Sequence, residues 1–381
     1  IIARLDELDS FGVTSKAGKR VGVDTALQVA AVFACVNVLA NGCAQPPLHV
    51  WRQLGDGRRQ LARNLRIYRI LHRRPNAWMT SFEFRRTMTA HAALTNNAFA
   101  FKNRVNGEIR ELIPIMPGNV TIEELPDHET RYVIADDRGD IVGRFGRRDV
   151  LHLRGISWDG HRGADLVRLA RDAIGLSIAT EESQSKLHAN GGKPGGILTT
   201  SESLGPEQLE QIRQAWQRRF AGSGNAFGTA VLDKGMDFKS LSMTGVDAQT
   251  LESRKHQVEE VCRFFNVFPQ MVMQSDKSST YASAEAFFGA HVRQTLAPWH
   301  ELWKQTLDEF LLDGAGPLYV DFDIRELTKA SIADREAFYR TVTEMGIYTR
   351  NEIREMEGLE PIAGLDEPLT PRNMGTGNEG G

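Results

Sequence analysis

The side chains in this sequence that best match a hydrolytic site lie within one short segment. Ser157, Asp159 and His161 supply a nucleophile, a carboxylate and an imidazole base within five residues. Catalytic triads usually combine residues from distant segments, because three neighbouring side chains of one loop rarely converge. An ordinary polar loop is therefore the favoured interpretation, and a soluble α+β hydrolase that uses this segment is the alternative.

Other patterns that could support catalysis or metal binding are weak. The sequence contains no phosphate-loop, nucleophile-elbow or H-E-x-x-H motif. His291 and His300 are nine residues apart on one predicted helix, too far for an i, i+4 pair of metal ligands. The glycine-rich run at residues 190–196 includes Pro194, which has no amide hydrogen for a phosphate, so we expect a hinge or tight turn. We therefore predict no catalytic residue, no metal site and no cofactor.

The composition is that of a globular chain. With 381 residues, 41% of them hydrophobic and 25% charged, the chain is expected to form two or three compact units. Cys35, Cys43 and Cys262 are scattered and are interpreted as buried thiols in a reducing compartment. The chain starts with Ile1 rather than Met and shows no signal peptide, so we expect its native start to be missing.

Residues 25–44 are the one stretch that is long and apolar enough to suggest a membrane span. They carry no charge, but Gln28, Asn37 and Asn41 interrupt them. Polar groups are costly in lipid. We therefore expect a buried amphipathic helix and no association with a membrane.

The charge balance argues against a tight grip on nucleic acid. The formal net charge is −3, whereas proteins that neutralise phosphates usually carry a basic excess. Arg213, Arg218 and Arg219 share one predicted helix with Glu207 and Glu210. This mixture is typical of a solvated or interfacial helix face. A module that grips DNA through the three arginines is a second alternative, which the net charge disfavours.

The first part of the chain alternates helical and extended patterns, which predicts an α+β fold. The Asn106-Gly107 pair is typical of a tight hairpin turn between two strands. Helices are expected at 25–44, at 61–74 and from Ser81 onwards, and strands at 48–52, 97–104, 109–115, 120–124, 131–135 and 150–154.

The second part is dominated by long helices. The longest pattern covers residues 281–312, where Pro298 removes a backbone hydrogen bond and should kink the helix. The other expected elements are helices at 163–190 and 246–265, an insert between them with strands at 196–200, 229–232 and 238–243 and a helix at 206–220, a strand at 318–324, and two short helices within 331–358.

The order of short strings along the chain resembles that of phage portal proteins. Each string is weak alone, but the set covers nearly the whole chain in the family's order. Two departures are local: Asn96-Asn97-Ala98 stands where Gly-Asn-Ala is common, and residues 163–166 lack the usual Ser-Pro. The strings are ACVNVLA at 34–40, PLHV at 47–50, LHRRPN at 71–76, SFEF at 81–84, VLHLR at 150–154, KPGGIL at 193–198, DAQ at 247–249, LE at 251–252, FP at 268–269, STY at 279–281, TLAP at 295–298 and GIYTRNEIR at 346–354.

The resemblance implies a ring, usually a dodecamer, at one capsid vertex, with wing, stem, clip and crown regions. The ring would carry double-stranded DNA into and out of the capsid of a virus or a gene transfer agent. The implied regions are most of the wing at 1–162, the stem helices at 163–191 and 246–266, the clip at 192–245, the tunnel loop and kinked wing helix at 267–325, the crown at 326–364 and a disordered tail at 365–381.

The resemblance also assigns residues and partners. The clip would dock the terminase large subunit and later a head–tail adaptor protein, and the ring would meet the major capsid and scaffold proteins. The protein would be assembled in the host bacterial cytoplasm and reside in the virion. The absence of a basic stripe suits a conduit, because many phosphate contacts would hold DNA in place. The tunnel loop would be Gln274, Ser275, Asp276, Lys277, Ser278 and Ser279, and the clip surface Glu207, Glu210, Arg213, Arg218 and Arg219.

Overall fold

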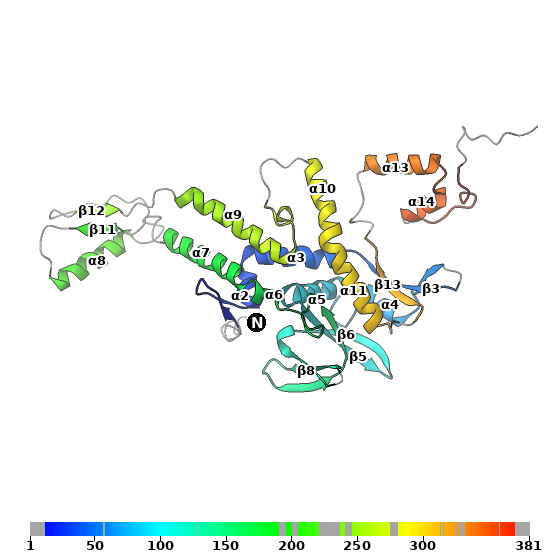
Figure 1. Ribbon diagram of the computed structural model, residues 1–381, viewed down its shortest axis with the longest axis horizontal. Coiled ribbons are helices and arrows are strands. Elements are labelled where there is room, and N and C mark those ends of the chain that lie inside the picture. Colours follow the sequence, from blue (N-terminus) through cyan, green and yellow to red (C-terminus); the bar gives the residue numbers. More distant parts are fainter. Residues whose placement is uncertain are drawn as a thin grey trace, which may run out of the picture. The chain divides into compact units, whose positions relative to one another are not determined.

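The chain divides into two compact units, Ile1–Phe322 and Asp323–Gly381. The structure is a computed structural model, and Figure 1 traces its elements along the chain. It describes residues 12–55, 58–126, 128–189, 196–199, 205–220, 237–240, 246–274, 281–312, 314, 316–324, 327, 332–357 and 359–369.

A layer of helices forms the centre of the first unit. The apolar stretch predicted as one helix at 25–44 is two helices, α2 (Val23–Gln28) and α3 (Ala30–Ala44). The single-helix prediction was wrong at Val29, which has an extended backbone (φ −75°, ψ 116°) and a buried side chain. Tertiary burial of this β-branched residue outweighs the helical pattern around it. Helix α3 packs against α5 (Ser81–Thr95), whose capping box is formed by Thr80 and Glu83.

Two buried cations satisfy the carbonyl ends of helices. The Arg85 guanidinium donates to the carbonyls of Ala44 (2.6 Å) and Pro46 (3.1 Å), just past the end of α3. Lys102 Nζ donates to the carbonyl of Phe310 (2.9 Å), the last residue of α11 (Ala297–Phe310). Positive charge at a helix C-terminus complements the helix dipole. Burial still lowers the pKa of Arg85 to about 10.

Among its described residues, the first unit has three antiparallel three-stranded sheets. The first has the order β10-β5-β6 and the second the order β7-β8-β9, and they share a core of Phe99, Tyr132, Ile134 and Val150. Asn106 and Gly107 both have positive φ, which confirms the predicted hairpin turn between β5 and β6. The strands are β5 (Asn97–Val105), β6 (Glu108–Ile115), β7 (Val120–Glu124), β8 (Thr130–Ala135), β9 (Ile141–Phe145) and β10 (Val150–Arg154).

The third sheet joins distant parts of the unit, in the order β13-β3-β4. It consists of β3 (Leu48–Gln53), β4 (Arg59–Leu61) and β13 (Leu318–Phe322). The helix predicted at 61–74 was wrong in its first turn, because Leu61 pairs with Trp51 as the last residue of β4. The helix there is α4 (Arg66–His72).

The rest of the first unit is mainly helical. A short pair of strands, β1 (Val13–Thr14) and β2 (Arg20–Val21), precedes α2. The helix predicted at 163–190 is divided at Ala170 into α6 (Leu166–Leu169) and α7 (Arg171–Ala189). The described parts of the following insert are β11 (Gly196–Thr199), α8 (Pro206–Phe220) and β12 (Asp237–Ser240), and the chain continues with α9 (Val246–Phe265). A strand predicted at 229–232 lies outside the described residues.

Within the described residues of the second unit, two short helices lie in the predicted range 331–358. Helix α13 (Ile332–Glu344) precedes α14 (Arg350–Met356), which starts with a Thr349–Glu352 capping box. Asn351 donates to the carbonyl of Ile362 (2.9 Å) and to the carboxylate of Asp366 (2.7 Å). Leu365 and Asp366 are therefore bonded to α14, and the disordered tail expected at 365–381 stays a prediction.

Candidate functional site

The predicted tunnel loop follows the end of α9. Gln274 is the one member within the described residues, and its amide donates to the carbonyl of Pro269 (3.0 Å) at the end of the 3₁₀ turn Pro269–Val272. Ser275, Asp276, Lys277, Ser278 and Ser279 lie outside the described residues. Helix α10 (Tyr281–His291) begins directly after them. The described residues on either side of the predicted loop are thus the 3₁₀ turn Pro269–Val272 and α10, and the role of the loop stays a prediction.

The predicted clip surface is described only in part. Glu207 and Glu210 are exposed near the start of α8, where acidic residues suit the positive end of the helix dipole. Glu210 also accepts a hydrogen bond from Gln214 Nε2 (3.2 Å). The side chains of Arg213, Arg218 and Arg219 lie outside the described residues.

Helices α7 and α9 lie side by side and run antiparallel (Figure 1), and polar side chains connect them. Gln257 Nε2 donates to Thr180 Oγ1 (3.1 Å), and Arg254 forms an ion pair with Glu181 (3.7 Å). Lys19, beside β2, bonds Glu182 of α7 at 2.5 Å and lowers the pKa of that carboxyl. The helix pair thus carries partly exposed, mixed charges and is anchored to the core at one end.

The anchored end of α9 is apolar and packs on α3. Cys262 of α9 and Cys35 of α3 are both buried, with their sulfurs 3.8 Å apart. The hydrogen bond between them raises the pKa of Cys35, and burial raises that of Cys43 to about 12. All three cysteines are free and buried, as the sequence predicted.

The long helix from 281 to 310 is irregular beside Pro298. Residues Val292–Leu296 form a π-helical turn between α10 and α11, and Pro298 lies in the first turn of α11. In a regular α-helix, the amide of residue 298 would donate to the carbonyl of Gln294, and proline has no such hydrogen. Asn266 Nδ2 donates to this carbonyl instead (3.3 Å), while Thr295 Oγ1 donates to the Asn266 carbonyl (2.7 Å). The π-turn is therefore fastened to the end of α9.

The same junction touches α3 very closely. A Cβ atom on Gly42 would lie 2.5 Å from Leu296 Cδ2, so any larger residue would require the buried Leu296 side chain to move. His300 Nε2 donates to the Gly42 carbonyl (3.0 Å), and burial lowers the pKa of His300. Trp303 Nε1 donates to Thr89 Oγ1 of α5 (3.1 Å). His300 is thus a buried core residue whose ring bonds the backbone.

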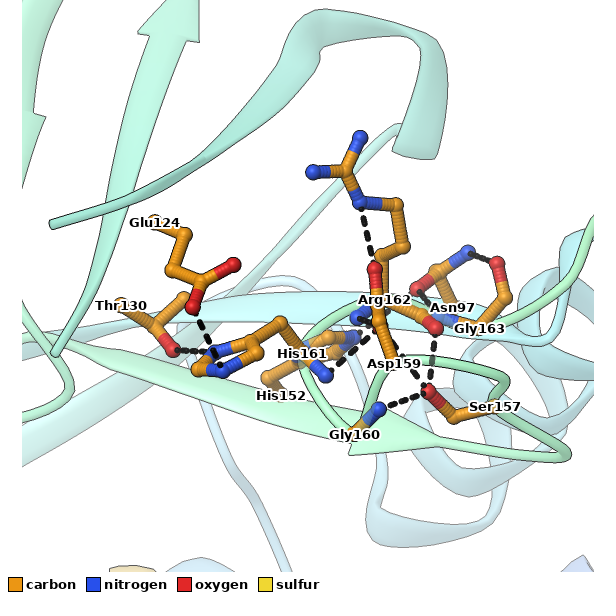
Figure 2. A network of polar contacts seen from close by, with 10 residues as sticks. All are labelled: Asn97, Glu124, Thr130, His152, Ser157, Asp159, Gly160, His161, Arg162 and Gly163. Carbon is orange, nitrogen blue, oxygen red and sulfur yellow. Dashed lines mark hydrogen bonds and ion pairs between the residues drawn. The ribbon is translucent and has the colours of Figure 1, made fainter. Parts of the chain in front are cut away.

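Figure 2 shows that Ser157, Asp159 and His161 do not form a triad. Ser157 Oγ donates to Asp159 (3.2 Å) and accepts from the amide of Gly160 (2.9 Å), and Asp159 accepts from the amides of His161 (2.8 Å) and Arg162 (2.9 Å). These bonds lower the pKa of Asp159 to about 2. The His161 ring instead faces Glu124 and Thr130. Ser157 therefore has no base from this loop, and its hydroxyl stabilises a turn.

Asn97 and His152 connect this loop to the sheets, and the sequence analysis overlooked both (Figure 2). Asn97 accepts from the amide of Gly163 (2.7 Å) and donates to its carbonyl (3.1 Å). Its oxygen is thus an acceptor, so His152 Nε2 carries the proton that it shares with this oxygen (3.1 Å), and Nδ1 accepts from the Tyr132 hydroxyl (3.3 Å). The Asn-Asn step after α5 was the available signal.

An open cavity of about 490 Å³ lies between β8, β10 and α11. Its ionisable lining includes Arg147, His152, Arg154 and Asp308. Burial, aided by Arg154 and Arg147, lowers the pKa of His152 to about 3, and burial raises the pKa of Asp308. Both groups are already used structurally, because Asp308 accepts from the amide of Val320 (2.7 Å) of β13. Neither His152 nor Asp308 is therefore free to act as a general base for the hydrolase alternative.

The described residues thus define a framework of paired helices and small sheets without an assembled triad. No helix among them is both long and apolar enough to cross a bilayer. Residues 30–358 match the family model for the phage portal protein. The portal protein of Enterobacteria phage HK97 is 28% identical over 345 residues, which cover 89% of this chain and 81% of that protein. The probable portal protein of Streptomyces phage phiC31 is 28% identical over 389 residues, 96% of this chain and 82% of that protein.

Solved structures agree on the fold. The neck of a native gene transfer agent particle, computed with C12 symmetry, contains a chain with a TM-score of 0.59 and 20% identity, and the match covers 95% of this chain and 99% of that chain. The chain belongs to the phage portal protein family, whose function is to form a channel for DNA. The resemblance and the α+β class predicted from the sequence are confirmed, and the hydrolase alternative has no support.

Proposed function

We propose that this chain is one subunit of a ring, usually a dodecamer, through which double-stranded DNA is packaged into a capsid and later ejected. The observation that carries the proposal is the antiparallel pair α7 and α9 with an insert between them, because such a pair can project a clip from an anchored core. The C12 symmetry named for the related neck structure supports the subunit number. In this proposal the protein has no enzymatic activity of its own.

The regions are proposed as follows. Residues 163–191 and 246–266 are the stem, which includes α7 and α9, and residues 192–245 are the clip. Most of the wing is at 1–162, residues 267–325 hold the tunnel loop and the irregular helix, and residues 326–364, with α13 and α14, are the crown. The mixed charges on α7 and α9 suit wet, head-to-tail contacts between neighbouring subunits that close by rotation.

The partners belong to the same proposal. The clip, with exposed Glu207 and Glu210, docks the terminase large subunit and then a head–tail adaptor protein. Gln274 to Ser279 line the channel, where Lys277 of each subunit offers one positive charge to the passing backbone. The net charge of −3 limits phosphate contacts and lets DNA slide. The ring meets the major capsid and scaffold proteins during assembly in the bacterial cytoplasm and remains in the virion.

Native mass spectrometry with negative-stain microscopy of the purified chain tests the proposal. Closed rings of about a dozen subunits with a central hole are expected. A compact monomer or dimer that stays unchanged when scaffold protein is added would contradict it. The variant Lys277→Ala serves as a matched control, since it changes the proposed channel charge and should leave ring assembly intact.

A further inference from the structure

Two histidines and a glutamate from separate segments converge beside the β7–β8 hairpin. Glu124 ends β7, His128 lies in the hairpin loop, and His161 lies in the loop after β10 (Figure 2 shows Glu124 and His161). Glu124 Oε1 is 3.2 Å from His128 Nδ1 and 3.5 Å from His161 Nε2. One ligand atom from each residue lies within 4.8 Å of the other two.

These distances match the edges of a tetrahedral zinc site. Zinc binds histidine nitrogen and carboxylate oxygen at about 2.0–2.2 Å, so two ligand atoms of a tetrahedron are about 3.3–3.5 Å apart. Both distances from Glu124 are close to this range, and the ligand atoms of His128 and His161 lie within 4.8 Å of each other. Two imidazoles and one carboxylate form a donor set that suits zinc, whereas magnesium and calcium prefer oxygen ligands only.

The surroundings hold the His161 ring in the orientation that a metal ligand needs. Thr130 Oγ1 lies 3.0 Å from His161 Nδ1, and Thr130 is only 4% exposed. Arg147 Nη2 donates to the same hydroxyl oxygen (3.4 Å), which fixes the hydroxyl in place. A ring whose Nδ1 is engaged by a buried neighbour presents Nε2 to a metal in a defined direction. The His161 side chain is 15% exposed, so its ring is largely shielded while Nε2 faces Glu124.

The geometry points to a Zn²⁺ site formed by Glu124, His128 and His161, with a fourth position open to water or to a ligand from another molecule. A bound ion would fasten the β7–β8 hairpin to the loop that leads into α6 and α7. Without an ion, Glu124 keeps only its contacts to the two imidazoles, and contacts of this kind at a surface contribute little to stability. The inference is independent of the proposed function, since it concerns a local property of one chain.

Zinc titration of the full chain, freed of any histidine tag and treated with a chelator, tests the site. Competition against a chromophoric chelator should report one Zn²⁺ per chain. The variants His161→Gln, Glu124→Gln and His128→Gln should each weaken binding by about tenfold or more. The His128 side chain is 85% exposed, so this variant is expected to fold normally.

The matched control is His256→Gln on α9. His256 and Glu260 form an exposed pair 3.8 Å apart with the same residue types, but no third ligand is grouped with them among the described residues. Binding should be unchanged in this variant, and Co²⁺ in place of Zn²⁺ should give a tetrahedral absorption spectrum that His128→Gln abolishes. The inference is overturned if the native chain binds no stoichiometric Zn²⁺, or if His128→Gln and His161→Gln bind it as tightly as the native chain.

Discussion

At the scale of single residues, His152 shows how a buried imidazole can be a structural group. Its ring packs 4.5 Å from that of Phe99 and shares hydrogen bonds with Asn97 and Tyr132. A protonated ring would lose the acceptor that the Tyr132 hydroxyl needs and would add charge beside Arg154 and Arg147. The neutral form is therefore part of the native fold.

This arrangement predicts a specific sensitivity to acid. The pKa of His152 falls from 6.5 to about 3 on folding, so the unfolded chain takes up a proton in this window and the native chain does not. The neutral ring's contribution to the free energy of unfolding is complete above pH 6.5. It is lost as the pH falls toward 3, by about 1.4 kcal/mol for each pH unit. Urea unfolding across this range should show a shallower decline for His152→Gln than for the native chain. Equal slopes would contradict the assignment, and His256→Gln provides the comparison for an exposed histidine.

A second prediction at this scale concerns Gly163. A Cβ atom there would lie 1.9 Å from the Asn96 carbonyl oxygen, so the two chain segments could not keep their contact. Gly163→Ala is expected to lower the free energy of unfolding by at least about 2 kcal/mol. Gly146→Ala is the matched control, because a Cβ at Gly146 meets nothing within 4 Å. Equal urea midpoints for the two variants would exclude the proposed clash.

Asn96 explains one departure from the family's sequence pattern. Its φ of 54° is in the left-handed region at the end of α5, where glycine is favoured and asparagine is tolerated. Its side-chain amide also donates to the carbonyl of Ala164 (2.5 Å). The departures at 96–98 and at 163–166 are therefore neighbours in space, which the linear sequence could not reveal.

At the scale of elements, the junction between α9 and the π-turn depends on Asn266. This residue has a φ of 51°, and its side-chain amide donates a hydrogen bond to the Gln294 carbonyl. Asn266→Gly should cost about 1 kcal/mol of unfolding free energy, because one hydrogen bond is lost. Asn266→Ala should cost about 1 kcal/mol more, because alanine also resists positive φ. If chemical denaturation gives the same loss for both variants, the backbone strain is absent.

The sequence predicted long, strongly patterned elements well. The bounds of α8 and α9 match the expected ranges 206–220 and 246–265, because proline, glycine and apolar periodicity mark them clearly. The prediction of secondary structure failed where tertiary contacts determine the backbone, as at Val29 and Leu61. It also missed β9, whose Ile141 and Val142 are exposed. The candidate metal site was harder to predict, because Glu124 and His161 come together only through the packing of two separate sheets on a shared core. The predicted role of the tunnel loop remains a prediction.

At the scale of the whole molecule, the division of the chain after Phe322 suggests an experiment with two truncated variants. Strand β13 pairs with β3 and contributes Val320, which is fully buried, to the first unit. A chain that ends after residue 324 should keep the unfolding free energy of this unit. A chain that ends after residue 316 should lose several kcal/mol, since burial of each large apolar side chain contributes about 1.5–3 kcal/mol. Circular dichroism during urea unfolding distinguishes them, and equal stability would refute the role of β13.

The π-turn at Val292–Leu296 also sets the rotation of α11 about the helix axis relative to α10. Each residue of an α-helix turns the chain by about 100°, so one additional residue within a turn rotates everything downstream by that angle. The rotation places His300 against Gly42 and Trp303 against Thr89. The orientation of α10 about its axis is not changed by it. Removing a single residue from this turn would direct the aromatic face of α11 away from α3 and α5. The length of one turn therefore determines which surface of the long helix belongs to the core.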